Sequence, residues 1–252
     1  MEFSVCTDKL FGSGNDICQS IWKVSECGFN TFEFWYWWSK DPLSIRQAMD
    51  RLHMKCAAFC TKVVSLTEAD RLYEYLEGLK ETLEVAKLLD CEIIISQAGN
   101  EIEGLSRELQ HKTLVFGLKA AAKLVEKADV TLVLEPLNVK VDHTGYFLYS
   151  STEAFEVIRE VGSENVKLLF DIYHQQISSG NIIADITGNI DYIGHFHAAG
   201  APGRGTILSG EINYFDVIKA IEETGYSGFF GIEYLPKDDP VKSLIEIKKA
   251  FT

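Results

Sequence analysis

Four short apolar segments in the second half of the chain, each ending in a polar residue, place the strongest constraint on its fold. Their apolar parts are rich in β-branched and aromatic residues, which predicts buried strands. Packing explains one such ending, but four endings that recur about once per strand–helix unit indicate a shared site. The segments are TLVLEP (131–136), VKLLFDIYH (166–174), DYIGHFHAAG (191–200) and GFFGIEY (228–234), and the polar residues are Glu135, Asp171, His197 and Glu233.

The whole chain alternates between apolar segments of this kind and amphipathic segments that predict helices. Such alternation implies parallel strands joined by right-handed crossovers. Eight strand–helix units in 252 residues predict an α/β protein, a single-domain TIM (β/α)8 barrel over residues 1–252, with a doubly wound open sheet as the alternative. The expected strands lie in 2–7, 29–38, 54–61, 92–99, 131–138, 166–174, 193–200 and 228–234, where the strand in 29–38 runs into an aromatic loop. The expected helices are 17–28, 41–53, 67–91, 106–129, 151–162, 213–225 and 239–252, with a short helical connection at 177–190.

The four strand endings predict a metal site, because the carboxyl ends of parallel barrel strands open onto one face. Three carboxylates and one imidazole, without a thiolate, favour Mg²⁺ or Mn²⁺ over structural zinc. The three carboxylates would be costly to bury together unless a cation occupied the site. The alternative is that Glu135, Asp171, His197 and Glu233 are unrelated buried or rim residues.

Several further polar residues lie near the expected strand ends. Arg204, in a Pro-Gly-Arg-Gly loop, can bind a substrate carboxylate or hydroxyl groups. His195 points the same way as the histidine two residues later, and is expected to be a satisfied core histidine one layer deeper. His174 follows the expected sixth strand, His143 is equally suited to the site or the surface, and Glu211 is read as an acid in the first turn of a helix.

The first third of the chain contains a Gly-rich loop at 8–16, an aromatic cluster and all six cysteines. The loop contains GSGND rather than GxGxxG, so it is weak support for dinucleotide binding. Most rings of the cluster at 35–38 are expected in the core or at an interface of a possible homo-oligomer, while one or two are suited to line a pocket. The cysteines form no CxxC pair, which favours buried free thiols in a reducing compartment.

The overall charge restricts the partners. A formal net charge of −13 and a pI of about 4.9 argue against nucleic acid or an anionic membrane as a partner. No apolar run approaches about 20 residues, and MEFSVCTDKL lacks the basic and apolar regions of a signal peptide. We therefore expect a cytoplasmic protein that acts on a small molecule.

The chemistry suggested by these residues is proton transfer next to a chelated carbonyl group. A divalent cation that holds adjacent carbonyl and hydroxyl oxygens acidifies the neighbouring C–H and stabilises the resulting enediolate. Glu135 or Glu233 can remove that proton and return it at the neighbouring carbon or on the opposite face. The outcome is aldose–ketose isomerisation or epimerisation, and metal-assisted hydrolysis is the alternative.

Five motifs of the chain resemble hydroxypyruvate isomerases, which belong to the xylose isomerase-like TIM-barrel superfamily together with ketose 3-epimerases. The motifs are LEPLN (134–138), VKLLFDIYHQQ (166–176), HFHAAGAPGR (195–204), GEINY (210–214) and GIEY (231–234). The chain departs from the family after its PGR motif, where relatives often have a His-Glu-Pro-like stretch and this chain has Gly-Thr-Ile-Leu.

The resemblance implies a role for each candidate. It places Glu135, Asp171, His197 and Glu233 at the metal positions, Glu135 and Glu233 also as the acid/base pair, and His174 and Arg204 at substrate-binding positions. It implies a metal-dependent isomerase that interconverts a small hydroxy-oxo acid, such as hydroxypyruvate, with its aldehyde isomer. The alternatives are a 3-epimerase of free ketoses, a metal-dependent phosphodiester hydrolase and a non-catalytic sugar-binding barrel.

Overall fold

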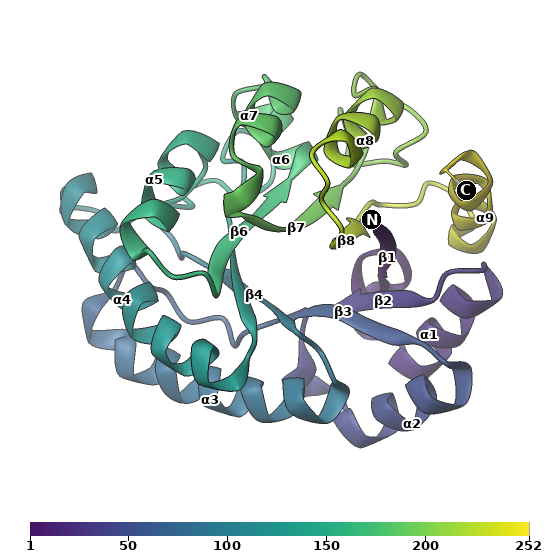
Figure 1. The fold of residues 1–252 in the computed structure, drawn as a ribbon, viewed down its shortest axis with the longest axis horizontal. Coiled ribbons are helices and arrows are strands. Elements are labelled where there is room, and N and C mark those ends of the chain that lie inside the picture. The colour runs from purple at the N-terminus through teal and green to yellow at the C-terminus, as the bar shows by residue number, and fades with distance from the viewer. Residues whose placement is uncertain (252) are drawn as a thin grey trace.

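The computed structural model describes residues 1–251, which form a closed barrel of eight parallel strands. Strand β1 pairs with both β2 and β8, so the sheet has no free edge, and the helices surround it (Figure 1). The TIM-barrel prediction is confirmed and the open sheet is excluded. The strands are β1 (Glu2–Cys6), β2 (Thr31–Phe34), β3 (Lys55–Cys60), β4 (Ile93–Gln97), β5 (Thr131–Glu135), β6 (Val166–Asp171), β7 (Ile193–Ala198) and β8 (Phe229–Ile232).

Most helices follow the predicted segments with changes at their ends, but a helix over residues 172–178 begins inside the predicted sixth strand, and a separate helix over residues 182–188 lies within the expected helical segment 177–190. They are α1 (Ile17–Glu26), α2 (Pro42–Leu52), α3 (Leu72–Leu89), α4 (Arg107–Ala128), α5 (Ser151–Val161), α6 (Ile172–Ser178), α7 (Ile182–Gly188), α8 (Tyr214–Glu223) and α9 (Pro240–Phe251). Side chains cap several of their ends: the Asp41 and Ser106 side chains accept backbone N–H groups at the starts of α2 and α4. Gly162 ends α5 with a φ of 69°, a left-handed conformation that glycine adopts at little cost.

Alternation of side chains along the strands separates the barrel interior from the layer beneath the helices. On β5, Leu132 and Leu134 face the helices, whereas Val133 packs inside the barrel with Ala58 and Leu169. Because successive side chains point to opposite faces, the residue two positions after an interior residue also points inward. The same alternation therefore directs the polar strand endings into the mouth of the barrel.

Two predictions were wrong for local reasons. The expected strand 166–174 ends at Asp171, because the Asp171 carboxylate accepts the His174 N–H at 3.1 Å and starts α6. The second strand ends at Phe34 and runs into an aromatic loop, as expected, with a 3₁₀ turn over Trp37–Ser39. The expected loop 8–16 begins with a π-helical turn over Asp8–Gly12.

The state of the cysteines and the absence of a membrane-spanning helix among the described residues were both expected from the sequence. All six cysteines are free thiols, as predicted; five of them are buried, and Cys18 is half-buried. Within residues 1–251, no helix combines the length and the apolar character that a membrane span requires.

Candidate active site

A cavity of about 550 Å³ opens at the carboxyl ends of the strands. Its size suits a small molecule. Residues from both halves of the chain line it, so the first four strands and their loops contribute to the site as well as the last four strands. Its polar lining includes Lys9, Trp35, Gln97, Glu135, His143, His174, His197, Arg204 and Glu233.

The structure brings the four strand-end residues together. One ligand-capable atom from each of Glu135, Asp171, His197 and Glu233 lies within 4.8 Å of the others. Glu135 and Asp171 are the last residues of β5 and β6, His197 lies in β7, and Glu233 directly follows β8. All four side chains are buried, with at most 7% of any residue exposed. The cluster that the strand pattern predicted is therefore real, although these residues are far apart in the sequence.

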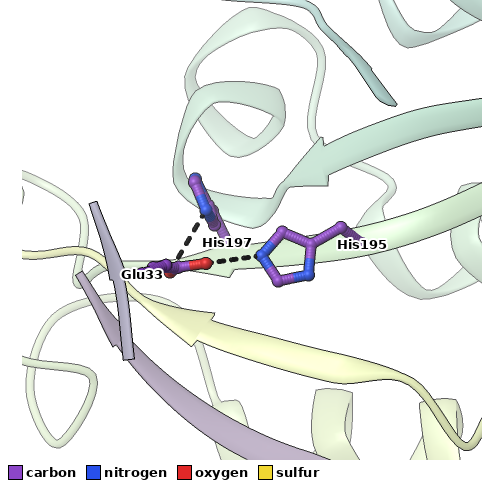
Figure 2. Close-up of side chains that lie close together, drawn as sticks. All are labelled: Glu33, His195 and His197. Carbon is purple, nitrogen blue, oxygen red and sulfur yellow. Dashed lines mark hydrogen bonds and ion pairs between the residues drawn. The ribbon is translucent and has the colours of Figure 1, made fainter. Parts of the chain in front are cut away.

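The His197 imidazole lies between the carboxylate cluster and a fourth acidic residue, Glu33. Figure 2 shows the contacts of Glu33 with His195 and His197. Its Nδ1 is 3.7 Å from Glu135 Oε1 and 3.7 Å from Glu233 Oε2, while its Nε2 is 3.3 Å from Glu33 Oε1. Burial opposes the charged imidazole, but Glu33 and Glu233 outweigh it, so the pKa of His197 is raised well above its usual value. The ring thus presents one nitrogen to Glu33 and the other to the cluster.

Glu33 is a site residue that the sequence interpretation missed. It is 1% exposed at the carboxyl end of β2, and its Oε2 is 2.7 Å from His195 Nε2. Burial raises its pKa, but the two histidines outweigh burial and lower the pKa of Glu33 to about 2. His195 is a buried core histidine, as expected, but only its Nε2 has a hydrogen-bond partner among the described residues, so the expectation of a satisfied ring holds for one nitrogen. A carboxylate inside the apolar run FNTFEFW needs such a partner, and this was the available signal.

We expect Glu33→Gln to weaken binding of Mn²⁺ to the cluster by about 10–100-fold, because groups that orient a metal-ligating histidine commonly have effects of this size. A glutamine cannot offer both histidines a carboxylate oxygen, so it would no longer fix the orientation of His197. Titration of free Mn²⁺ by electron paramagnetic resonance measures the affinity. An unchanged affinity in a folded variant would show that Glu33 does not orient His197 for binding.

Gly231 on β8 provides the space that Glu33 and His197 occupy. A Cβ atom at this position would lie 2.2 Å from Glu33 Oε1 and 2.6 Å from His197 Cδ2. We expect Gly231→Ala to lower the free energy of unfolding by about 1–3 kcal/mol, the usual cost of overpacking. Urea denaturation measures this loss. Gly188→Ala is the matched control, because a Cβ there has no neighbour within 4 Å; equal stabilities of the two variants would contradict the steric argument.

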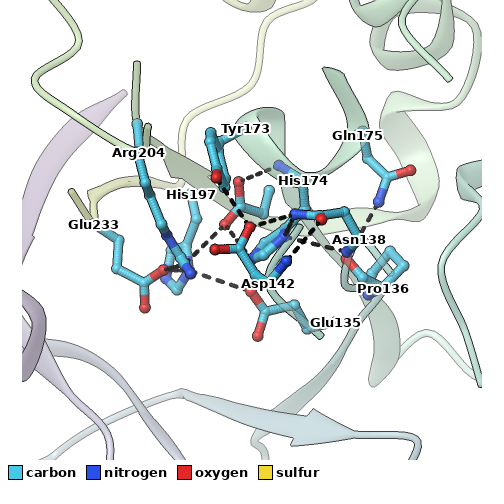
Figure 3. Close-up of polar contacts among 12 residues, drawn as sticks. Glu135, Pro136, Asn138, Asp142, Tyr173, His174, Gln175, His197, Arg204 and Glu233 are labelled. Carbon is cyan, nitrogen blue, oxygen red and sulfur yellow. Dashed lines mark hydrogen bonds and ion pairs between the residues drawn. The ribbon is translucent and has the colours of Figure 1, made fainter. Parts of the chain in front are cut away.

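Arg204 contacts two carboxylates of the cluster (Figure 3). Its Nη2 forms a salt bridge with Glu233 Oε2 and lies 3.6 Å from Asp171 Oδ2. Its loop is fixed over the barrel mouth, because the Leu235 N–H donates to the Arg204 carbonyl at 2.7 Å. Arg204 is buried, with 7% exposed, and these two carboxylates compensate much of its charge within the protein.

Glu233 also accepts a hydrogen bond from the Trp35 indole N–H at 2.8 Å. Burial raises its pKa, but the Arg204 and His197 charges outweigh burial and lower the pKa of Glu233 to about 2. Burial instead dominates at Glu135 and Asp171, and the pKa of each is raised. The paired glutamates therefore lie in different electrostatic environments.

His174 is held as a neutral hydrogen-bond donor. Its Nδ1 lies 3.2 Å from the Asn138 backbone N–H, which can only donate, so this nitrogen is the acceptor and Nε2 carries the proton. Burial and the charge of Arg204 keep the pKa of His174 well below its usual value. Nε2 lies 3.6 Å from Asp171 Oδ2 and has no hydrogen-bond partner among residues 1–251, so it is available to a substrate oxygen.

The remaining candidates separate into two groups. His143 lines the cavity, and its ring centroid is 5.3 Å from that of His174, which places it at the site rather than on a distant surface. Trp35 and Tyr36 also line the cavity, as expected of one or two rings of the aromatic cluster. Glu211 is exposed and lies before α8 begins at Tyr214, so its assignment to the first helical turn was wrong. Asp216 takes that position.

The four-residue cluster fits a divalent cation. His197 Nδ1 is buried, faces two carboxylates and has no hydrogen-bond partner among the described residues. Three carboxylates and one imidazole nitrogen form a donor set typical of Mg²⁺ or Mn²⁺. Two positively charged groups, Arg204 and protonated His197, offset the carboxylates in the protein alone. A divalent cation can replace the proton on His197 Nδ1 and compensate the negative charges of the three carboxylates.

Several known proteins are similar to this chain in sequence. A family model described as "Xylose isomerase-like TIM barrel" matches residues 21–250. Hydroxypyruvate isomerase of Escherichia coli is 30% identical over 245 residues, with 94% of each chain covered. The 2-oxo-tetronate isomerase of Cupriavidus necator is 29% identical over 218 residues, covering 83% of this chain and 84% of the relative.

A solved structure shares the fold closely. The structure titled AP endonuclease, family 2, from Brucella melitensis has a TM-score of 0.92 and 24% sequence identity, with 98% of each chain covered. At this identity the likeness shows the fold alone.

Proposed function

The chain belongs to the xylose isomerase-like TIM-barrel family and is an enzyme of the isomerase class, and from this premise we propose that it interconverts a small hydroxy-oxo acid of the hydroxypyruvate type with its aldehyde isomer. The reaction depends on a divalent cation, Mg²⁺ or Mn²⁺, held by Glu135, Asp171, His197 and Glu233. One observation carries the proposal: these four side chains meet within 4.8 Å at a cavity of small-molecule size.

The reaction moves one carbon-bound proton and one oxygen-bound proton. In hydroxypyruvate, C3 carries two hydrogens and a hydroxyl group, and C2 is a carbonyl. A base removes a proton from C3, the electron pair forms the C2–C3 double bond, and the C2 oxygen becomes an enediolate oxygen. A proton then returns to C2, and the C3 hydroxyl proton passes to the C2 oxygen, which gives the aldehyde, tartronate semialdehyde, with the same atoms.

The residues of the chain supply the groups that these steps need. Glu135 and Glu233 reach the same point from strands that are not neighbours, so the carboxylate pair can accept a proton at one carbon and return it at the next. Trp35 and Arg204 fix the position of Glu233. His174 donates its Nε2 proton in a hydrogen bond to a substrate oxygen. When bound, a divalent cation would polarise the carbonyl group and stabilise the negative charge on the oxygens.

Turnover measurements with matched substrates test the proposal. Protein treated with a chelator and then supplied with Mg²⁺ or Mn²⁺ is incubated with hydroxypyruvate or with a neutral ketose such as D-tagatose, and products are followed by NMR. We expect isomerisation of hydroxypyruvate that requires the added cation. Turnover of the neutral ketose alone would support 3-epimerisation instead, and turnover of neither would contradict both functions.

Phosphodiester hydrolysis is a weaker candidate for this barrel. A nucleic-acid substrate is expected to meet a basic surface, but the chain has a formal net charge of −13. The cavity also has its carboxylates concentrated at its base, around His197. Both properties suit a small chelating substrate better than a phosphate backbone.

A further inference from the structure

The π-helical turn Asp8–Gly12, which follows β1 at the active-site end of the barrel, places Lys9 at the cavity. Lys9 is half-buried, and its Nζ lies over the Trp35 ring, 5.7 Å from the centroid. The N–H of this same indole donates to Glu233. The Trp35 ring therefore contacts both Lys9 and Glu233, one member of the proposed acid/base pair.

The neighbouring residue, Asp8, fixes the turn. Asp8 is 5% exposed, and its Oδ2 accepts the Trp35 N–H at 2.9 Å and contacts Lys40 Nζ at 2.9 Å. These contacts hold the turn against the loop that follows β2. Short π-helical segments often occur at functional sites. This one is held by the contacts of Asp8 and places Lys9 at the cavity.

Lys9 and Arg204 differ in how their charges are compensated. Arg204 already contacts the carboxylates of Glu233 and Asp171. Lys9, in contrast, has no carboxylate within 4.0 Å of its Nζ in residues 1–251. The cavity therefore contains one positively charged side chain, Arg204, that contacts carboxylates closely, and another, Lys9, that does not.

Burial and repulsion by Arg204 lower the pKa of Lys9, and the attraction of Glu233 and Asp142 only partly opposes them. An anionic group bound at the cavity would offset both effects. The substrate hydroxyls of a neutral sugar would not, because they carry no charge.

We propose that Lys9 binds the carboxylate of the substrate and so selects oxo acids over neutral sugars. This inference rests on the proposed function, because it assigns the acid group of that substrate to a residue. It also differs from the expectation that Arg204 binds a substrate carboxylate or hydroxyl groups. In this assignment, Arg204 mainly positions Glu233, and Lys9 supplies the free charge.

Lys9→Met tests the assignment, because methionine keeps much of the side-chain length and removes the charge. We expect KM for hydroxypyruvate to rise about 10–100-fold, as for loss of a charge-assisted hydrogen bond, with kcat changed less than about threefold. Lys9→Arg should restore most of the lost affinity. Lys219→Met, at an exposed position on α8, is the matched control and should behave like the unchanged protein.

A binding measurement keeps this test separate from catalysis. Calorimetry with D-glycerate, which has the carboxylate, and glycerol, which lacks it, is performed on the Mg²⁺-supplied protein and on both Lys9 variants. We expect only glycerate binding to weaken in Lys9→Met. Unchanged glycerate affinity and unchanged KM would overturn the role of Lys9 while leaving the isomerase intact, whereas absence of hydroxypyruvate turnover in the unsubstituted protein would contradict the proposed function itself.

Discussion

Replacing Glu233 with glutamine is expected to lower kcat for hydroxypyruvate by about a thousandfold or more. A positioned general acid or base commonly contributes 10²–10⁴-fold, and this side chain is also a proposed ligand of the cation. Glutamine keeps the shape and can still accept the Trp35 N–H, but it cannot take a proton from carbon at neutral pH. Steady-state kinetics at saturating cation measures the loss.

The control for this substitution is Glu222→Gln, at an exposed position on α8, which should retain full activity. Circular dichroism and the melting temperature of Glu233→Gln show whether the barrel is intact. A folded Glu233→Gln protein that binds Mn²⁺ and keeps more than about a tenth of kcat would contradict a role in proton transfer, since that loss is below the range expected of a general base.

The second large effect is expected from loss of the cation. Chelation should reduce turnover to the uncatalysed background, and Mn²⁺ or Mg²⁺ should restore it. A cation that binds only the folded protein also stabilises it, by about 2.7 kcal/mol at a concentration one hundred times its Kd. The melting temperature should therefore rise as cation is added, whether or not a substrate is present.

Asp171→Asn separates binding of the cation from the local fold. Its remaining side-chain oxygen can still accept the His174 N–H that starts α6, but one of the negative charges of the cluster is lost. We expect the Mn²⁺ affinity to fall by more than about 100-fold, beyond the range seen for groups outside the ligand set. Paramagnetic resonance with Mn²⁺ measures it. Activity that survives chelation, or an Asp171→Asn protein with unchanged affinity, would contradict a cation at this cluster.

Much of the architecture was predictable because it depends on local periodicity. Alternation of apolar strands and amphipathic helices predicted the closed barrel, and the polar endings of 131–136, 166–174, 191–200 and 228–234 predicted the cluster. In a parallel barrel, strand order along the chain determines which endings meet. The sequence therefore contained the positions of Glu135, Asp171, His197 and Glu233, which the structure brings within 4.8 Å.

The role of Glu33 and the bond between Trp35 and Glu233 were missed because both depend on contacts across the barrel. Glu33 contacts His195, which is 162 positions later, and Trp35 contacts Glu233, which is 198 positions later. The carboxylate of Glu33 within an apolar run signals a buried partner, but no local pattern identifies which residue that partner is. The π-helical turn that carries Lys9 was missed for a different reason. A Gly-rich stretch predicts a loop, whereas the turn depends on the tertiary contacts of Asp8.

The most direct measurement of the central claim, proton transfer by the glutamate pair, follows deuterium in the product. Hydroxypyruvate, protein and Mg²⁺ are incubated in deuterated water, and the aldehyde product is examined by NMR, with a chelated sample and Glu233→Gln as controls. We predict deuterium at C2 of the product, because the carboxylates exchange with solvent between removing and returning a proton. Product that forms at the full rate without deuterium at C2 would indicate hydride transfer between the carbons and would contradict the account.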